Sequence, residues 1–110
     1  MELNKTELGV LAKFHEIIDP AFDYRGEYEV SERVGNPAGF MTHLRTRTDR
    51  VLGKRKVFED LPHAITARNI MVGFLVYHDG KTATAIEGYI ADDNENWENK
   101  GNGIDWLSGT

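Results

Sequence analysis

The chain has 110 residues, of which 40% are hydrophobic and 28% charged, and its formal net charge is -5. These values predict one globular domain with a modest core and exclude an intrinsically disordered chain. There is no cysteine, which excludes disulfides, thiolate metal sites and a cysteine nucleophile. An acidic N-terminus and the lack of a long apolar run predict a cytoplasmic protein that does not enter a membrane.

The first predicted element is a helix over residues 5–18. Asn4, followed three residues later by Glu7, is typical of a capping box. Apolar residues then recur at helical spacing, namely Leu8, Leu11, Phe14, Ile17 and Ile18. The helix is expected to end at Asp19 because the residue before a proline is disfavoured in the α region.

A strand is predicted over residues 22–30, followed by a loop over residues 31–35. In the strand, alternate positions are aromatic, aliphatic or glycine: Phe22, Tyr24, Gly26, Tyr28 and Val30. The intervening positions are charged, which is the period-two pattern of a half-buried strand. Gly26 is the expected site of a bulge.

Two structures compete for residues 36–53. Asn36-Pro37 and Gly53 have the properties of helix caps, and Phe40, Leu44, Thr48 and Val51 lie on one helical stripe between them, so we predict a second helix. The alternative is a strand, because Thr42, Thr46 and Thr48 are β-branched and alternate with His43, Arg45 and Arg47. Residues 54–58 are expected to form a short strand, and residues 60–62 a turn or one-turn helix.

The clearest pattern is a β-hairpin with strands at residues 70–77 and 82–90. Two alternating apolar runs flank Asp79-Gly80, a dipeptide that favours hairpin turns. In each run, alternate residues point to one face of the sheet and can pack in a core. They are Ile70, Val72, Phe74 and Val76 in the first run, and Thr82, Thr84, Ile86, Gly88 and Ile90 in the second.

These elements predict an α+β fold, in which one or two helices pack on an antiparallel sheet of three to four strands. Residues 1–91 are expected to form a single domain. Residues 92–110 are expected to form an acidic segment rich in Asn and Gly, either a loop or a docked tail.

Charge is distributed unevenly along the chain. Residues 43–68 contain seven bases against three acids, whereas residues 87–110 contain one base against six acids. Basic residues on one surface would favour nucleic acid, and the candidates are Arg45, Arg47, Arg50, Lys54, Arg55 and Lys56. The alternative is a solvated face or pairing with acids of the same chain, and a pI near 5.3 argues against a dedicated nucleic-acid binder.

The acidic segment combines carboxylates with two tryptophans, residues that are common in protein interfaces. The candidate protein-binding residues are Asp92, Asp93, Glu95, Trp97, Glu98, Asp105 and Trp106. The alternative is that the tryptophans fold back and close one end of the sheet. The spacing of the carboxylates does not match a calcium loop.

The four histidines are too scattered for a metal site, since no pair has the i,i+4 spacing that places two ligands on one helix face. His63 with Asp60 or Glu59 best fits an acid–base pair beneath a curved sheet. An ordinary structural role is favoured for each histidine. We therefore predict no catalytic residue, no metal site and no cofactor.

The middle of the chain contains Arg50-Val51, then Glu59-Asp60-x-Pro62, then Arg68-x-Ile70, leading into the hairpin VYHDGKTATAIEGY. With these landmarks, roughly 40 of the 110 residues resemble NTF2-like domains. The resemblance implies an enzyme or a ligand binder with a pocket between helix and sheet. It transfers no functional residue to this chain.

The absence of chemistry-bearing motifs, together with the uneven charge, favours a small non-enzymatic module that binds another protein. By size and composition it resembles the inhibitors and adaptors of phages and mobile elements. We expect the partner to have a basic surface. Nucleic-acid binding through the basic segment and an NTF2-like ligand binder are the alternatives, and pairing of the exposed hairpin edge would give a homo-oligomer.

Overall fold

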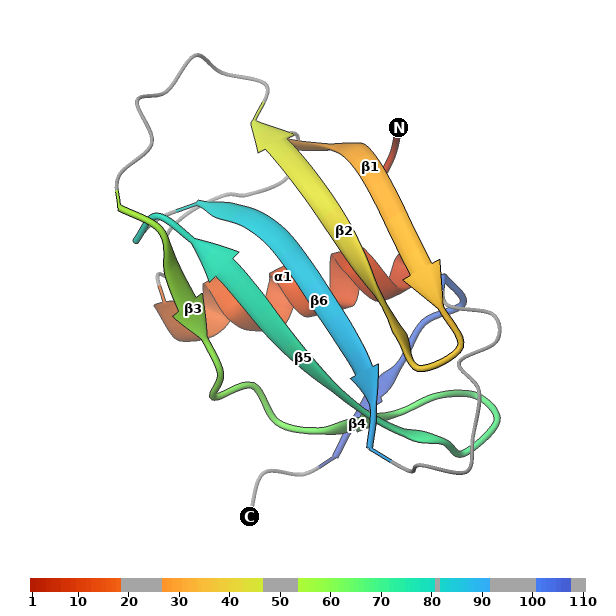
Figure 1. The fold of residues 1–110 in the computed structure, drawn as a ribbon. Coiled ribbons are helices and arrows are strands. Elements are labelled where there is room, and N and C mark those ends of the chain that lie inside the picture. The colour runs from red at the N-terminus through yellow and green to blue at the C-terminus, as the bar shows by residue number, and fades with distance from the viewer. Residues whose placement is uncertain (19–26, 47–53, 81, 92–100, 108–110) are drawn as a thin grey trace.

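The computed structural model describes residues 1–18, 27–46, 54–80, 82–91 and 101–107. In these residues one helix packs on one face of a seven-stranded antiparallel sheet (Figure 1). The elements are α1 (Lys5–Ile18), β1 (Tyr28–Asn36), β2 (Gly39–Thr46), β3 (Lys56–Phe58), β4 (Ala64–Ile65), β5 (Met71–His78), β6 (Ala83–Ile90) and β7 (Asp105–Trp106). The strand order is β1-β2-β6-β5-β4-β7, and β3 pairs with β5. The α+β prediction is confirmed, but the sheet is larger than expected.

The predicted hairpin is confirmed as β5 and β6. The register pairs Phe74 with Gly88 and Val76 with Ile86, so one parity of both strands faces α1. In the turn, Gly80 has a φ of 108°, a conformation that glycine adopts without steric cost. The Asp79 carboxylate accepts a hydrogen bond from the Thr82 amide at 2.8 Å, which closes the turn.

The predicted helix is also confirmed, with the predicted bounds. The Asn4 side chain accepts a hydrogen bond from the Glu7 amide at 2.9 Å, and Glu7 in turn accepts one from the Asn4 amide at 2.8 Å. This reciprocal pair is the expected capping box. Val10, Leu11 and Phe14 then form the buried stripe of α1.

The predicted second helix is wrong. The described residues of that region form β2, which pairs with β1 on one side and β6 on the other. The alternation of β-branched residues with His43 and Arg45 was therefore the correct pattern, and pairing with two neighbours outweighs the helix-cap residues. Positions 47–53, which include Thr48 and Val51, lie outside the described residues.

The predicted loop over residues 31–35 is also wrong, because β1 continues to Asn36. Its polar sequence suits an edge strand, where charged residues discourage pairing with another chain. The predicted strand was correct for Tyr28 and Val30, whereas residues 22–26, including the expected bulge at Gly26, lie outside the described residues. The short strand predicted within residues 54–58 is confirmed as β3.

A β-bulge at Ser31 determines which side chains of β1 face α1. The register changes between Val30 and Glu32, so that Val30 pairs with Leu44 and Arg33 pairs with Thr42. A bulge moves the following residues to the opposite face of the sheet. Arg33 consequently faces α1, on the same side of the sheet as buried Val30.

Glu7 joins the helix to this edge of the sheet. Its fully buried carboxylate accepts hydrogen bonds from Arg33 Nε at 2.8 Å and Nη2 at 2.7 Å, and from Thr42 Oγ1 at 2.6 Å. Burial alone would raise the pKa of Glu7, but hydrogen bonds from Arg33, Thr42 and Asn4 outweigh it and hold the pKa below its ordinary value. With the Asn4 amide included, each carboxylate oxygen accepts two hydrogen bonds.

The core lies between α1 and the sheet. Phe14 of α1 packs edge-on against Phe58 of β3, and Phe74 of β5 packs edge-on against Trp106 of β7. Near the end of the helix, His15 Nε2 lies 2.9 Å from the hydroxyl of Tyr28, which accepts a hydrogen bond from the Ala83 amide. No helix in the described part of the chain has both the length and the apolar character required to span a membrane.

Candidate protein-binding face

The sheet has a second face, turned away from α1, that no described element covers (Figure 1). Cross-strand partners in a sheet point to the same side, so the register identifies its residues. One row crosses Val34, Met41, Glu87 and Leu75, and the next crosses His43, Ala85, Tyr77 and Val57. We call this surface the open face and define it by these residues together with Gly39, Gly73, Tyr89 and Met71.

Apolar side chains dominate the open face. Among the described residues, seven large hydrophobic side chains are exposed, and four of them lie here: Val34, Val57, Met71 and Tyr89. The solvated face of an antiparallel sheet ordinarily alternates to polar residues. A contiguous apolar surface rimmed by charges is instead typical of an interaction site.

Polar groups on the open face are arranged around Tyr77. Its hydroxyl donates a hydrogen bond to Glu87 Oε1 at 3.0 Å, and the Arg55 guanidinium lies over its ring, 4.5 Å from the centroid. The hydrogen bond to the Glu87 carboxylate, with smaller contributions from burial and nearby carboxylates, raises the pKa of Tyr77. Tyr77 is therefore a neutral donor near pH 7, and Glu87 is the acceptor.

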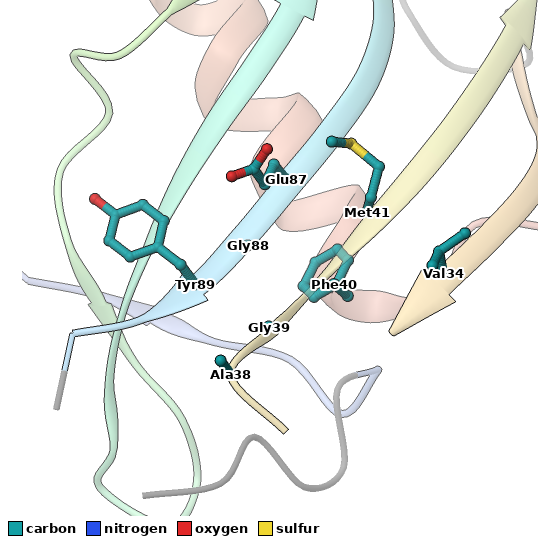
Figure 2. A pocket seen from close by; sticks show the side chains of 8 residues that line it. All are labelled: Val34, Ala38, Gly39, Phe40, Met41, Glu87, Gly88 and Tyr89. Carbon is teal, nitrogen blue, oxygen red and sulfur yellow. The ribbon is translucent and has the colours of Figure 1, made fainter. Parts of the chain in front are cut away.

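A hollow of about 330 Å³ opens between β2 and β6 (Figure 2). Figure 2 shows Glu87, Met41 and Tyr89 around two positions that lack side chains, Gly39 and Gly88, with α1 behind the strands. The Tyr89 ring leans away from β2 and lies over Gly73, where an added Cβ would collide with it. The lining residues are Val34, Ala38, Gly39, Phe40, Met41, Glu87, Gly88 and Tyr89.

Two of the residues that were predicted to bind protein, Asp105 and Trp106, point to opposite sides of the sheet. Asp105 is exposed and shares a cross-strand row with Ile65 and Met71, which places it on the side of the open face. Trp106 faces the opposite side, where it packs on Phe74, 5.6 Å between ring centroids. Asp92, Asp93, Glu95, Trp97 and Glu98 lie outside the described residues, so their role stays a prediction.

Trp106 also lines a hollow beside the C-terminal half of α1. Lys13 Nζ lies 6.0 Å from the centroid of the Trp106 ring, and Asp60, Pro62 and Ile17 line the same hollow. The Trp106 indole thus closes one end of the core. For this residue, the alternative that a tryptophan folds back onto the sheet describes the structure.

The described bases of the segment 45–56 do not form one surface. Arg45 stands on the same side as the open face, but its guanidinium donates a hydrogen bond to Glu29 at 2.5 Å. Arg55 covers Tyr77, whereas Lys56 pairs with His78 on the side that faces α1. Lys54 is exposed, and Arg47 and Arg50 lie outside the described residues.

Packed side chains occupy the centre of the layer in which a ligand pocket was considered. Phe14 and Phe74 occupy the space between α1 and the sheet, and both are buried. His63 is exposed, and its carbonyl accepts a hydrogen bond from the Leu107 amide. A cavity of about 240 Å³ remains at the β1 edge beside Glu7 and Arg33, but every acceptor position of the Glu7 carboxylate is already used.

The sequence contained one unused signal for the open face. In the hairpin, the parity that does not face the core also carries apolar or aromatic residues, namely Met71, Leu75, Tyr77 and Tyr89. A sheet face left to solvent predicts polar residues at those positions. Their apolar character was the signal in the sequence that this face departs from the ordinary pattern.

Comparison with known proteins gives no match: no protein-family model, curated protein or solved structure is similar to this chain. Within the described ranges, no three histidine or carboxylate side chains come close enough together to hold a metal ion.

Proposed function

We propose that this protein is a protein-binding module that contacts its partner through the open face. The observation that supports this most strongly is the concentration of exposed apolar side chains on one side of the sheet. Methionine and tyrosine, which line this face at Met41, Tyr77 and Tyr89, are enriched in protein interfaces. Tyrosine is also among the residues that contribute most binding energy.

The stability of the fold supplies an argument for the same proposal. Apolar side chains stabilise a fold by roughly 25 cal/mol for each Å² removed from water. Val34, Val57 and Met71 are 44–50% exposed, so a large part of that free energy is not realised in the isolated chain. A partner that covers these side chains would realise it on binding.

The charges of the open face indicate the kind of partner. Glu87 lies at the centre of the apolar row, and Asp105 stands at the β7 edge of the same side of the sheet. Of the bases on this side, Arg45 is paired with Glu29, and Arg55 lies over the ring of Tyr77. A partner surface that is apolar with basic residues would complement this arrangement, in keeping with the charge of the whole chain.

The experiment that tests this proposal uses two substitutions matched in exposure. Val34→Arg alters the open face, where the side chain is 50% exposed, and Ile17→Arg alters α1, where the side chain is 47% exposed. Tagged wild-type and variant proteins would be incubated with lysate of the source organism, with and without nuclease. The proposal predicts a stoichiometric protein that survives nuclease, is retained by wild type and Ile17→Arg, and is lost with Val34→Arg.

Two outcomes would refute the proposal. Retention that disappears on nuclease treatment would indicate a nucleic-acid ligand. Equal retention by both variants, each shown by circular dichroism to be folded, would place the binding surface elsewhere on the protein.

A further inference from the structure

The hollow between β2 and β6 has a construction that indicates what it would hold. Its floor is open because Gly39 carries no side chain, and Tyr89 leans away over Gly73 (Figure 2). At Gly39 a Cβ would collide with the backbone carbonyl of Gly88, so a larger residue cannot fill the floor. The two strands thus keep this space empty by backbone packing.

Among the described residues, most of the lining is apolar and one lining residue is charged. Val34 and Met41 supply aliphatic surface, while Glu87 supplies a carboxylate at the rim. In its row, Glu87 stands between Met41 on one side and Leu75 on the other. No base among the described residues forms an ion pair with it, whereas Glu29 and Glu7 are both paired with arginine.

The hydrogen bonding of Glu87 fixes its carboxylate but does not saturate it. The Tyr77 hydroxyl donates to Oε1, which holds the side chain over the sheet. Oε2 accepts no hydrogen bond from the described part of the chain. A positioned carboxylate with a free oxygen beside an apolar hollow is complementary to a side chain that is apolar along its stem and cationic at its end.

We infer that this hollow receives an arginine or lysine side chain of the partner protein, with its cationic group bound by Glu87. This inference rests on the proposed function, because it places one contact within the open face. The aliphatic stem would lie on Met41 and Val34, which pair across β1 and β2. The cation would bind the Glu87 oxygen that Tyr77 leaves free.

A peptide titration tests this contact without a known partner. The probes are two capped tripeptides, N-acetyl-Leu-Arg-Leu-amide and the same peptide with citrulline, which is neutral and nearly isosteric, in place of arginine. Binding is followed by ¹H–¹⁵N correlation spectra of the full chain, through the amides of Gly39 and Gly88. Glu87→Gln removes the charge and keeps the shape, and Glu16→Gln on exposed α1 is the matched control.

The expected result is a shift of both glycine amides by the arginine peptide, with affinity about fivefold weaker for the citrulline peptide, as for an ion pair worth up to roughly 1 kcal/mol. Glu87→Gln should reduce binding of the arginine peptide to the citrulline level, and Glu16→Gln should leave it unchanged. Equal binding of the two peptides, no effect of Glu87→Gln, or no shift at either glycine up to millimolar peptide would each overturn the inference.

Failure of this inference can be distinguished from failure of the proposed function. If Val34→Arg abolishes partner capture but the peptides do not discriminate, the open face is an interface and the hollow does not bind a basic side chain. If sedimentation shows that the chain forms a dimer that Val34→Arg and Glu87→Gln both dissociate, a second copy occupies the face, and the inference of a separate partner is overturned.

Discussion

The two faces of the sheet differ in how completely their apolar side chains are buried and their carboxylates are hydrogen-bonded. On the side of α1, the apolar residues Phe14 and Phe74 are buried, and the buried carboxylate of Glu7 accepts four hydrogen bonds. On the open face, Val34 and Met71 remain exposed, and the Glu87 carboxylate has an oxygen without a donor among the described residues. One face is therefore organised for folding, and the other retains exposed apolar surface and unused hydrogen-bonding capacity.

This difference predicts losses of stability of very different size at two neighbouring residues of β5. Phe74→Asn should destabilise the fold by about 4 kcal/mol or more, because it removes a buried ring and buries an amide. Leu75→Asn, one residue along on the open face, should cost about 1 kcal/mol. Urea unfolding measures both. Similar losses at the two positions would mean that the open face is covered in solution.

The second largest effect is expected at Glu7. Glu7→Gln leaves Arg33 without its charged partner, and we expect a loss of about 2–3 kcal/mol, below the value for a fully buried pair because the Arg33 side chain is 36% exposed. Glu16→Gln, which disrupts an exposed ion pair with Lys13, should change the free energy of unfolding by less than about 0.5 kcal/mol. A neutral effect of Glu7→Gln in urea unfolding would show that the buried ion pair contributes little to stability.

Two glycines on the open face should differ in the same experiment. Gly39→Ala should cost about 1–3 kcal/mol, since the new methyl group meets the backbone of Gly88. At Gly73 the obstacle is the Tyr89 side chain, so the cost of Gly73→Ala should fall by at least about 0.5 kcal/mol in a Tyr89→Ala background. A double-mutant cycle in urea measures this coupling, and strictly additive values would contradict the contact.

Acid should destabilise the fold through two groups on the side of the sheet that α1 covers, His78 and Glu7. Burial has the largest effect on the pKa of His78 and lowers it. The charge of Lys56 lowers this pKa further, whereas the charge of Asp79 raises it by less. Because the folded pKa lies below the ordinary value of 6.5, the unfolded chain binds more protons, and stability falls as the pH drops from 6.5 through the folded pKa. The lowered pKa of Glu7 adds a further loss as the pH drops from 4.5 through its own folded pKa.

Urea midpoints at pH 7, 5.5 and 4 would measure this dependence. Between pH 7 and 5.5, the loss of stability should be smaller in His78→Gln than in wild type. Equal losses in the two proteins would show that His78 does not contribute to the acid sensitivity.

Local patterns in the sequence were sufficient for α1 and for the hairpin. The capping box, the helical stripe and the Asp79-Gly80 turn each involve residues within a few positions of one another, so their physics can be read from a short window. The region of β2 was predicted as a helix because residues with the properties of helix caps lie nearby in the sequence. Its structure is decided instead by pairing with β1 and β6, and a short window of sequence does not contain that pairing.

The candidate site depended on contacts that local patterns do not contain. The bulge at Ser31 reverses the side to which Arg33 points, and it joins Arg33 to Glu7, 26 residues away in the chain. The hollow arises only when Gly39 of β2 comes to lie beside Gly88 of β6. The acidic C-terminal segment was chosen by composition and stays a prediction, whereas the proposed face uses the outer parity of the hairpin, a pattern that the sequence analysis left unused.

Site-specific photocrosslinking would show whether a partner contacts the open face. A benzoylphenylalanine side chain placed at Val34, on the open face, would be compared with the same group at Ile17, on α1, in cells of the source organism. The account predicts a discrete covalent adduct with another protein from position 34 and none from position 17. An adduct from position 17 alone, or none from either position, would contradict a partner bound to the open face.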